Sequence, residues 1–423
     1  MKIITPRNFE SFVDSVTPKL SKQNEKLVQS ILLDVKKNGD SAIKHYEKKF
    51  GGTTLRSLRL SKKEIDDAYC EVSKKEITAI KLVKSRLSST ENIIKNLLKN
   101  SKINIDGIKI SKSFSPLESV GCYVPGGLAR YSSSAVMSIV PAKVVGVKRI
   151  VVTSPPNKKG KLDPLTIVAS DICGATEIYK IGGAQAIAAL SFGTKTIQQV
   201  DKIVGPGGPF VTLAKSLISN TTSIDMLAGP TELGIIADNS ADSNFIADDL
   251  ITQAEHSSES FCFLITTSSK FAKLVNKSIV KKIKKLKRSN IVTKSLRKNG
   301  FIAVCKSNTD VIKLANKLAP EHLQIISKNQ NKIADKINTC GIILIGKYTP
   351  SSASDYLLGS NHILPTNKFG RVRGSLSVLD FVKLGTKIES SKSSLQKISK
   401  YLKVLTTAEG LPNHYEAVRS RLE

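Results

Sequence analysis

A short polar stretch near the middle of the chain combines residue types that can bind a metal ion. Gln253 and His256 lie in the segment DDLITQAEH, where the apolar residues recur at helical spacing. Residues three apart on a helix share a face, so the amide oxygen and the imidazole can approach one point. Such a pair is half of a four-ligand zinc site. The same pair is also compatible with the polar end of an ordinary helix.

Histidine is sparse in this chain and gathers in its C-terminal half. Three of the later histidines have a carboxylate close by in sequence, and histidine is the usual acid/base and metal residue at neutral pH. Each one taken singly could equally be a structural residue with one hydrogen-bond partner. The five histidines are His45, His256, His322, His362 and His414, and the nearby carboxylates are Glu321, Asp355 and Glu409.

Two of these carboxylates, Glu321 and Asp355, lie at positions that could belong to an active site. Glu321 and His322 are adjacent and directly precede a predicted strand, so each could take a proton in a different reaction step. Asp355 follows a serine-rich turn at the start of a predicted helix. The alternatives are a charged surface turn for the first pair and a helix-dipole interaction for Asp355.

Three glycine loops follow predicted strands, at residues 121–127, 182–185 and 205–208. Glycine lets backbone N–H groups approach a ligand closely, and helix starts favour phosphate. None of the loops matches the GxGxxG dinucleotide fingerprint, and the chain has no Walker A sequence. They are therefore compatible with a ligand crevice at the strand ends or with ordinary turns.

The elements that must position these residues alternate between strand and helix. From residue 110 onward, short β-branched runs are separated by helical patterns, which predicts βαβ units on mostly parallel sheets. The predicted strands include residues 150–152, 177–181, 261–265 and 301–304. Two consecutive units of similar size suggest a duplication. Residues 1–110 read as helical, with a role in packing or dimerisation. The predicted divisions are 1–110 (helical), 111–238 (first α/β module), 239–378 (second α/β module) and 379–423 (helical tail).

Composition narrows the classes of function. The formal charge of +30 raises the possibility of nucleic-acid binding, but the lysines are widely spread, Trp is absent and Phe and Tyr are few. We therefore expect no specific nucleic-acid partner and read the lysines as solvated helix faces. We find no apolar run that could span a membrane. The six cysteines form no CxxC pair, which is typical of reduced, mostly buried thiols and predicts a cytoplasmic protein.

Taken together, these stretches resemble the histidinol dehydrogenase family. The resemblance covers nearly the whole chain and is densest from residue 121 onward. It rests on many ordered motifs: GCYVPGG, PAKVVGVKRIVV, IGGAQAIAALSFGT, VDKIVGPG, IDMLAGPTE, DLITQAEH, APEHLQI, SASDYLLGSNHILPT, SLSVLDF and AEGLPNHYEAV.

The resemblance implies two incomplete Rossmann-like modules in an intertwined homodimer, with one Zn²⁺ per subunit and NAD as the oxidant. It implies Glu321 and His322 as the acid/base pair. Glu409 and His414 would reach the active site of the other subunit. The implied zinc ligands are Gln253, His256, Asp355 and His414.

The same resemblance implies the cofactor and substrate contacts. Tyr123 and Gln185 would lie on the NAD side, and Gly208 stands where the family usually has an Asn that contacts NAD. Thr231 stands where the family often has a serine that contacts substrate, and Glu409 would recognise the substrate's imidazole. The residues implied to bind substrate are Thr231, Gln253, His256, His322, Asp355, Glu409 and His414. His362 is expected to be structural, and His45 to lie on the surface.

The implied reaction is the four-electron oxidation of L-histidinol to L-histidine through the aldehyde, using two NAD in turn. Zinc has no redox chemistry, so hydride would pass to the nicotinamide. His322 would deprotonate the alcohol and then the hydrated aldehyde, and Glu321 would activate the attacking water. The alternative on the same scaffold is oxidation of another small alcohol, such as a sulfonated diol, but a carboxylate at Glu409 favours the imidazole substrate.

Overall fold

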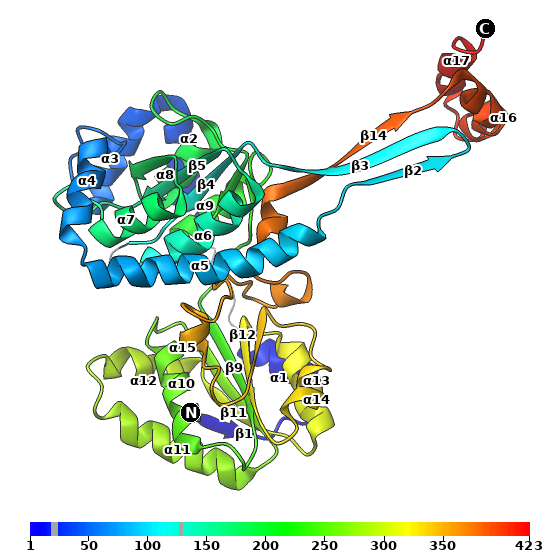
Figure 1. Cartoon of the computed structure of the whole chain (residues 1–423). Helices are drawn as coiled ribbons and strands as arrows, with labels where there is room; N and C mark the ends of the chain where they lie inside the picture. Colours follow the sequence, from blue (N-terminus) through cyan, green and yellow to red (C-terminus); the bar gives the residue numbers. More distant parts are fainter. Residues whose placement is uncertain (18–23, 127–129) are drawn as a thin grey trace.

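The computed structural model describes residues 1–17, 24–126 and 130–423, so Gly127 of the first glycine loop lies outside the described residues. Two α/β modules lie one above the other, and a long arm extends from the upper one (Figure 1). The arm carries the C-terminus at its tip, far from both sheets.

The first module is built on five parallel strands. Their spatial order is β6-β5-β4-β7-β8. Numbered within the module this is 3-2-1-4-5, the order of a Rossmann sheet without its sixth strand. The strands are β4 (Ser119–Tyr123), β5 (Arg149–Ser154), β6 (Glu177–Lys180), β7 (Lys202–Val204) and β8 (Ser223–Ile224). Strands β4 and β5 are almost wholly buried on both faces, as the inner strands of a parallel sheet require, whereas Ser223 of the edge strand β8 is exposed.

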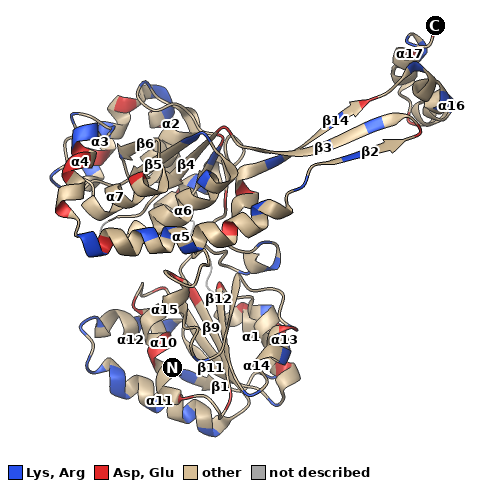
Figure 2. Ribbon diagram, in the orientation of Figure 1, with Lys and Arg blue, Asp and Glu red and all other residues tan. Residues whose placement is uncertain are grey.

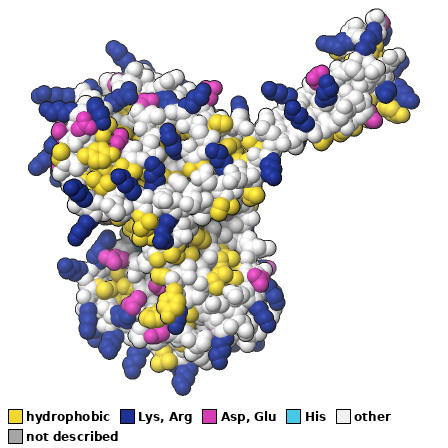
Figure 3. All heavy atoms as spheres, viewed as in Figure 1, with side chains coloured by type: hydrophobic (Ala, Val, Ile, Leu, Met, Phe, Trp, Pro, Cys, Tyr) yellow, Lys and Arg dark blue, Asp and Glu magenta, His cyan; other side chains and the backbone are white. Residues whose placement is uncertain are grey.

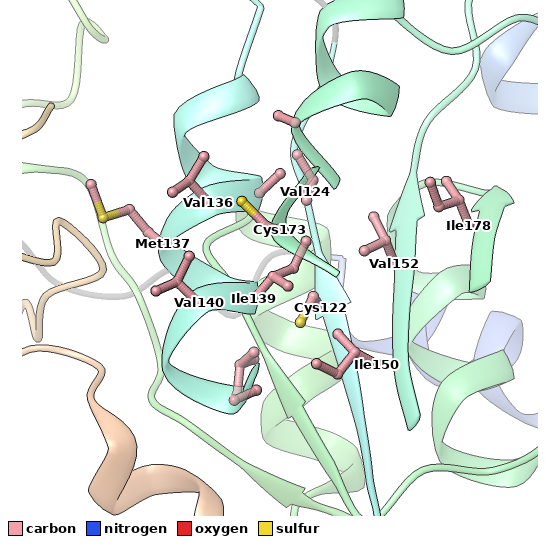
Figure 4. Packing of buried hydrophobic residues seen from close by; sticks show 14 of the residues in the cluster. Cys122, Val124, Val136, Met137, Ile139, Val140, Ile150, Val152, Cys173 and Ile178 are labelled. Carbon is pink, nitrogen blue, oxygen red and sulfur yellow. The ribbon is translucent and has the colours of Figure 1, made fainter. Parts of the chain in front are cut away.

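Helices cover both faces of this sheet in two layers. On one face, α6 (Ser132–Val145) and α7 (Pro164–Cys173) pack on the strands and are covered by α4 (Lys62–Glu71) and α5 (Lys74–Leu97). The core there joins valines and isoleucines of α6, β4 and β5 with the buried Cys122 and Cys173 (Figure 4). On the other face, α8 (Gly183–Phe192) and α9 (Pro209–Ile218) are covered by α2 (Glu25–Asn38) and α3 (Asp40–Gly51).

The second module repeats the strand order of the first. Its sheet runs β1-β11-β10-β9-β12-β13, all parallel, which is again 3-2-1-4-5 with β1 added beside β11. This confirms the predicted α/β class with mostly parallel sheets. The strands are β1 (Lys2–Ile4), β9 (Glu232–Ala237), β10 (Phe261–Thr266), β11 (Phe301–Val304), β12 (His322–Ile326) and β13 (Ile342–Ile345).

Helices again cover both faces of the second sheet. One face is covered by α10 (Ser243–Ala254), α11 (Ser269–Ile283) and α12 (Ser289–Lys298). The other is covered by α1 (Phe9–Val16), α13 (Asn308–Leu318) and α14 (Gln330–Ala334). After β13 come the one-turn helix α15 (Ser351–Ser354) and two 3₁₀ turns, η1 (Phe369–Arg371) and η2 (Val378–Phe381).

The arm is a three-stranded antiparallel sheet that ends in two helices. Its order is β14-β3-β2, with β2 (Ser101–Ile105), β3 (Ile108–Pro116) and β14 (Val382–Glu389). Helices α16 (Lys392–Ala408) and α17 (Pro412–Arg419) form the tip (Figure 1). Every residue of β2 is exposed, so this sheet has no core of its own.

The structure differs from the predicted helical segments at three places. Strand β14 opens the segment that was expected to be helical, and β2 lies inside residues 1–110. The third place is the start of the chain, where β1 pairs with β11 and α1 packs on α13, so residues 2–16 belong to the second module. Strand β14 pairs with β3 at separations from Val382↔Pro116 to Glu389↔Lys109, and β1 pairs with β11 at Lys2↔Phe301, so local periodicity does not reveal these two pairings; β2 pairs with the neighbouring β3.

Charge and thiols follow the expectations from composition. Lys and Arg side chains are scattered over both modules and the arm, with no single gathering on the face in view (Figures 2 and 3). Cys122, Cys173, Cys262 and Cys305 are buried free thiols, while Cys70 is exposed. Among the described residues, none of the helices is long and apolar enough to cross a bilayer.

Candidate active site

A cavity of about 500 Å³ lies between the two modules and collects most of the predicted site residues. The first module contributes the residues that follow β4 and β7, together with the start of α6. The second module contributes the residues that begin β9 and β12, with the end of α10. The lining residues that matter below are Arg130, Ser134, Gly207, Gly208, Thr231, Gln253, His256, Arg288, Glu321, His322, Asp355 and His362.

The two sheets present opposite edges to this cavity. Gly207 and Gly208 follow β7, so the first sheet turns its carboxyl edge to the cavity. Thr231 and Glu321 directly precede β9 and β12, so the second sheet turns its amino edge. The usual ligand position of an open α/β sheet, outside the carboxyl ends of its strands, therefore faces this cavity in the first module only.

Glu321 is delivered to the cavity by a sharp turn at the end of α13. Ala319 closes that helix in the left-handed conformation, at φ +46, a strained backbone for a residue with a Cβ. Pro320 then ends the turn, and β12 begins at His322. The Glu321 carboxylate is buried, and its Oε2 accepts the Thr231 hydroxyl at 2.7 Å and the Glu232 N–H at 2.8 Å.

Glu232 is a second buried carboxyl beside Glu321, and sequence reasoning missed it. Glu232 Oε2 accepts the Glu321 N–H at 3.1 Å, so each residue holds the other's backbone. Burial raises the pKa of Glu232 to about 8. The signal was available, because Glu232 directly follows Thr231 in the motif that carried the resemblance.

His322 is almost fully buried between two oxygen acceptors. Its Nδ1 lies 3.2 Å from the Glu232 carbonyl oxygen, and its Nε2 lies 3.2 Å from Asp355 Oδ1. Burial disfavours the charged ring, but the carboxylates of Glu321 and Asp355 outweigh this and raise the pKa of His322 to about 10. The predicted acid/base pair thus lies at the start of β12, with His322 Nδ1 3.6 Å from Glu321 Oε2.

Three of the four predicted metal ligands meet at the same cavity. Gln253 lies in the last turn of α10 and Asp355 caps the end of α15, but His256 lies two residues after α10 ends, so the expected pair on one helix face is instead a helix residue and a residue of the turn that follows. Gln253 Nε2 donates to the Thr231 hydroxyl oxygen at 2.6 Å, which leaves the amide oxygen as the group able to bind a cation. Burial alone would raise the pKa of Asp355, yet contact with His322 lowers it below its ordinary value.

His362 contacts the backbone of Asp355. Its Nδ1 lies 2.7 Å from the Asp355 carbonyl oxygen, and its Nε2 lies 3.4 Å from the Ser134 hydroxyl. Burial lowers the pKa of His362, which favours the neutral ring. This agrees with the structural role expected for it. His45 lies exposed on α3, as expected.

Glu409 and His414 are not brought to this cavity within the chain. Glu409 ends α16 and His414 lies on α17, both exposed at the tip of the arm (Figure 1). Over residues 1–17, 24–126 and 130–423 there is no group of three His, Cys, Asp or Glu side chains that could hold a metal ion. The cavity of a single chain offers one imidazole, one carboxylate and one amide oxygen from the predicted ligands.

The residues predicted to contact NAD lie in two separate places. Gly208 lines the cavity, whereas Tyr123 and Gln185 are buried beneath its wall and do not. The Tyr123 hydroxyl accepts the Gly183 N–H at 3.2 Å, and burial raises the pKa of Tyr123 to about 12. Gln185 Nε2 donates to Glu47 at 2.9 Å.

Glu47 is the second buried carboxyl that sequence reasoning missed. It comes from α3 and also accepts the Gly182 N–H at 2.8 Å, so it caps the start of α8. Burial raises the pKa of Glu47. The signal was its position on the apolar face of α3, one helical turn after Ile43 and beside Tyr46.

Comparison with known proteins decides the family. The sequence model of the histidinol dehydrogenase family matches residues 17–422. A histidinol dehydrogenase from Methanocaldococcus jannaschii is 42% identical over 396 residues, covering 94% of this chain and 92% of its own. One from Methanococcus maripaludis is 43% identical over 395 residues, covering 93% and 92%. The chain belongs to the histidinol dehydrogenase family.

A solved structure agrees over the whole molecule. The crystal structure of histidinol dehydrogenase from Elizabethkingia anophelis superposes with a TM-score of 0.93 at 33% identity, covering 100% of this chain and 98% of that one. The resemblance drawn from the motifs is therefore confirmed, as is the prediction of an NAD-dependent dehydrogenase of the histidinol dehydrogenase type.

Proposed function

We propose that this protein oxidises L-histidinol to L-histidine in two steps, each of which reduces one NAD, with one zinc ion per subunit. The observation that carries the proposal is the convergence of the acid/base pair, three candidate metal ligands and Gly208 on one cavity. Family membership supports the substrate, since the relatives above carry its name.

The donor set of the cavity fits zinc. Imidazole nitrogen and carboxylate oxygen are ordinary zinc ligands, and an amide oxygen is a weaker one that the Thr231 contact orients. We assign Gln253, His256 and Asp355 to the ion. When bound, zinc would act as a Lewis acid and as a template for the substrate's amine and imidazole.

The fourth ligand would come from a second copy of the chain. The exposed arm supports this, because it presents apolar side chains to solvent: Ile388 on β14 is 67% exposed and Val404 on α16 is 68% exposed. A homodimer would cover these residues and bring the partner's His414 and the partner's Glu409 to the cavity. Glu409 would then recognise the substrate's imidazole.

The acid/base chemistry falls to β12. Asp355 bound to zinc would no longer favour the charged ring of His322, so His322 Nε2 would take the proton of the alcohol while hydride passes to NAD, and it would take a proton again from the hydrated aldehyde. Glu321 would activate the water that attacks the aldehyde. Both contacts described for its carboxylate fall on Oε2, so Oε1 is the oxygen that would accept the proton. Thr231 joins the two halves of the site, since its hydroxyl bridges Gln253 and Glu321.

The cofactor would lie along the carboxyl edge of the first module. Gly208 offers backbone only. Arg130 is paired with Glu76 and Asp163, and Arg288 lies 3.8 Å from Glu255, so either guanidinium would have to turn from these carboxylates to meet the pyrophosphate. Tyr123 and Gln185 would act from beneath, by holding the start of α8 with Glu47.

The test is NADH formation by purified protein given L-histidinol and excess NAD, run to completion. We expect two NADH per histidinol, lost when a chelator removes the metal and restored by zinc. One NADH per substrate would show that the aldehyde escapes and would remove the role given to Glu321. No NADH from folded, zinc-loaded protein would refute the proposed substrate.

The shared site has its own test, in which two inactive variants complement each other. Asp355→Ala and His414→Ala chains are unfolded and refolded together. A mixed dimer then holds one doubly altered site and one intact site, so random pairing restores about a quarter of wild-type activity. Absence of recovery, with mixed dimers demonstrated by differently tagged chains, would place His414 in its own subunit's site or outside the site.

A further inference from the structure

A buried ion pair holds the loop after β7, and none of the roles assigned above uses it. Lys215 on α9 and Asp225 after β8 pair with each other, with side chains only 3% and 1% exposed. Asp225 Oδ2 accepts the Gly205 N–H at 2.8 Å, and Lys215 Nζ donates to the Gly205 carbonyl oxygen at 3.0 Å. Both polar groups of one backbone residue are therefore held by one ion pair.

Gly205 is the residue at which the loop leaves the strand, and its conformation is unusual. Its φ of +110 lies in the region that residues with a Cβ rarely adopt. A Cβ there would lie 2.1 Å from the Tyr123 carbonyl oxygen. The backbone at Gly205 is thus in direct contact with β4. The ion pair fixes the direction that the chain takes through Pro206, Gly207 and Gly208.

Asp225 is itself anchored to a second set of charges. Arg373 donates to the Asp225 carbonyl oxygen, and its Nη2 donates to both oxygens of Asp380 at 2.8 and 3.0 Å. Lys202 on β7 also donates to the Asp380 carbonyl oxygen, at 2.8 Å. Asp225 is thus linked through Arg373 to Asp380, and Asp380 is linked to Lys202 on β7. The ion pair therefore cannot shift without moving β7 or the segment before β14.

The loop that is fixed in this way presents backbone to the cavity. Gly207 and Gly208 line it, and a Cβ at Gly208 would have no heavy atom within 4 Å. A ligand at this place therefore meets N–H and carbonyl groups whose directions depend on Gly205. A buried ion pair by itself adds little stability compared with apolar residues of the same size. Orientation of the loop is what this pair supplies.

We propose that Lys215 and Asp225 are positioning residues that set the affinity for NAD by fixing the loop from Gly205 to Gly208. The inference rests on the proposed function for the identity of the ligand. It assigns a role to the IDMLAGPTE motif, whose Asp225 lies outside the cavity, and it predicts that the pair acts on the cofactor and not on histidinol.

The experiment removes both charges together, because a single change would leave one buried charge unpaired and could prevent folding. In Lys215→Met/Asp225→Asn, the Gly205 carbonyl loses its donor and the loop loses its fixed start. We expect the KM for NAD to rise about tenfold, with kcat and the KM for histidinol changed less than about twofold. Calorimetric titration with NAD alone should show the same loss of affinity.

A matched control is present in the same sheet. Arg149 and Glu177 form a partly buried pair at 2.6 Å at the opposite, amino edge of the first sheet. Arg149→Met/Glu177→Gln should lower the melting temperature but leave the KM for NAD unchanged. An unchanged KM in the folded Lys215/Asp225 variant, or an equal rise in both variants, would overturn the inference.

The two hypotheses can fail separately. If the wild-type protein does not oxidise histidinol, the proposed substrate is lost, but the titration with NAD alone still decides whether the ion pair controls cofactor binding. If the wild-type protein is active and the titration shows equal affinities, only the positioning role is lost.

Discussion

The two modules have the same strand order but offer opposite edges to the site between them. The first sheet gives its carboxyl edge, where glycine loops start helices. The second gives its amino edge, where Thr231 and Glu321 directly precede strands and His322 begins one. The edge that each module turns away from the site carries local polar contacts. In the first module Arg149 pairs with Glu177, and in the second Asp238 accepts the backbone N–H of Ser240 and of Lys328.

This difference shows how one fold supplies two kinds of chemistry. Loops after strands end in helix N-termini, whose N–H groups suit phosphate. Residues that begin neighbouring strands are instead held side by side by the sheet: His322 pairs with Leu233, so Thr231 and Glu232 lie beside Glu321. A rigid cluster of ionisable groups follows from strand register, and a cofactor loop follows from the helix that comes after a strand.

The largest expected effect is at the amino edge of the second module. In His322→Asn the side-chain amide can still donate to the Glu232 carbonyl, but it cannot accept a proton. We expect kcat to fall about 10²- to 10⁴-fold with the dissociation constant of NAD unchanged, measured by steady-state kinetics and titration. The exposed His45→Asn is the matched control. A weaker NAD affinity in His322→Asn would mean that the two edges are not separate in function.

The next effect concerns the loop edge of the first module. Gly205→Ala would force a Cβ against the Tyr123 carbonyl oxygen, so we expect unfolding free energy to fall by roughly 2–4 kcal/mol and the KM for NAD to rise. Chemical denaturation and kinetics measure the two. Gly146→Ala, at φ +97 with no atom within 4 Å of its Cβ, isolates the conformational cost. Equal losses in both variants would show that the contact with β4 is unimportant.

A smaller effect is expected at Gly208. Its φ of −68 accepts any residue and its surroundings are open, so Gly208→Asn should add a hydrogen bond to the cofactor. The KM for NAD should fall by about twofold to tenfold, without a higher kcat. Asn is also a good N-cap for α9. A higher melting temperature with an unchanged KM would mean that the amide caps the helix instead.

The smallest effect is expected at the carboxyl edge of the second module. A cavity of about 560 Å³ there is lined by Ser240, Ser327 and Tyr348 among others, in the position that a Rossmann sheet commonly gives to a ligand. Tyr348→Ala should leave both KM values and kcat within about twofold, because this edge lies across the sheet from the site. A large change in either KM would show that the second module uses both of its edges.

Much of the fold follows from local sequence. The β-branched runs that predicted strands at residues 150–152, 177–181, 261–265 and 301–304 coincide with β5, β6, β10 and β11. Strand β14 was missed although Val382, Leu384 and Ile388 alternate with other residues. The alternation is a strand signal, but it lies beside a longer helical pattern at residues 392–408 and pairs with β3, more than 260 residues away.

The candidate site likewise has features that the sequence indicated and features that it did not. The residue types and their order along the chain indicated the family, the proposed acid/base pair Glu321 and His322, and the ligand candidates at the ends of α10 and α15. Glu232 and Glu47 were missed as buried carboxyls although each had a local signal, because burial itself depends on the elements packed around them. It gave no sign that the second module would face the cavity with its amino edge.

The sequence by itself determined which side chains can do chemistry and which segments form helices and strands, since both depend on residues within a few positions of one another. Only the tertiary structure decided which of these side chains meet. It brought Thr231 to Glu321 and Asp355 to His322, buried Tyr123 and Gln185 beneath the cavity wall, and carried Glu409 and His414 to the tip of the arm. The physical reason is that these distances are set by the packing and register of strands far apart in the chain.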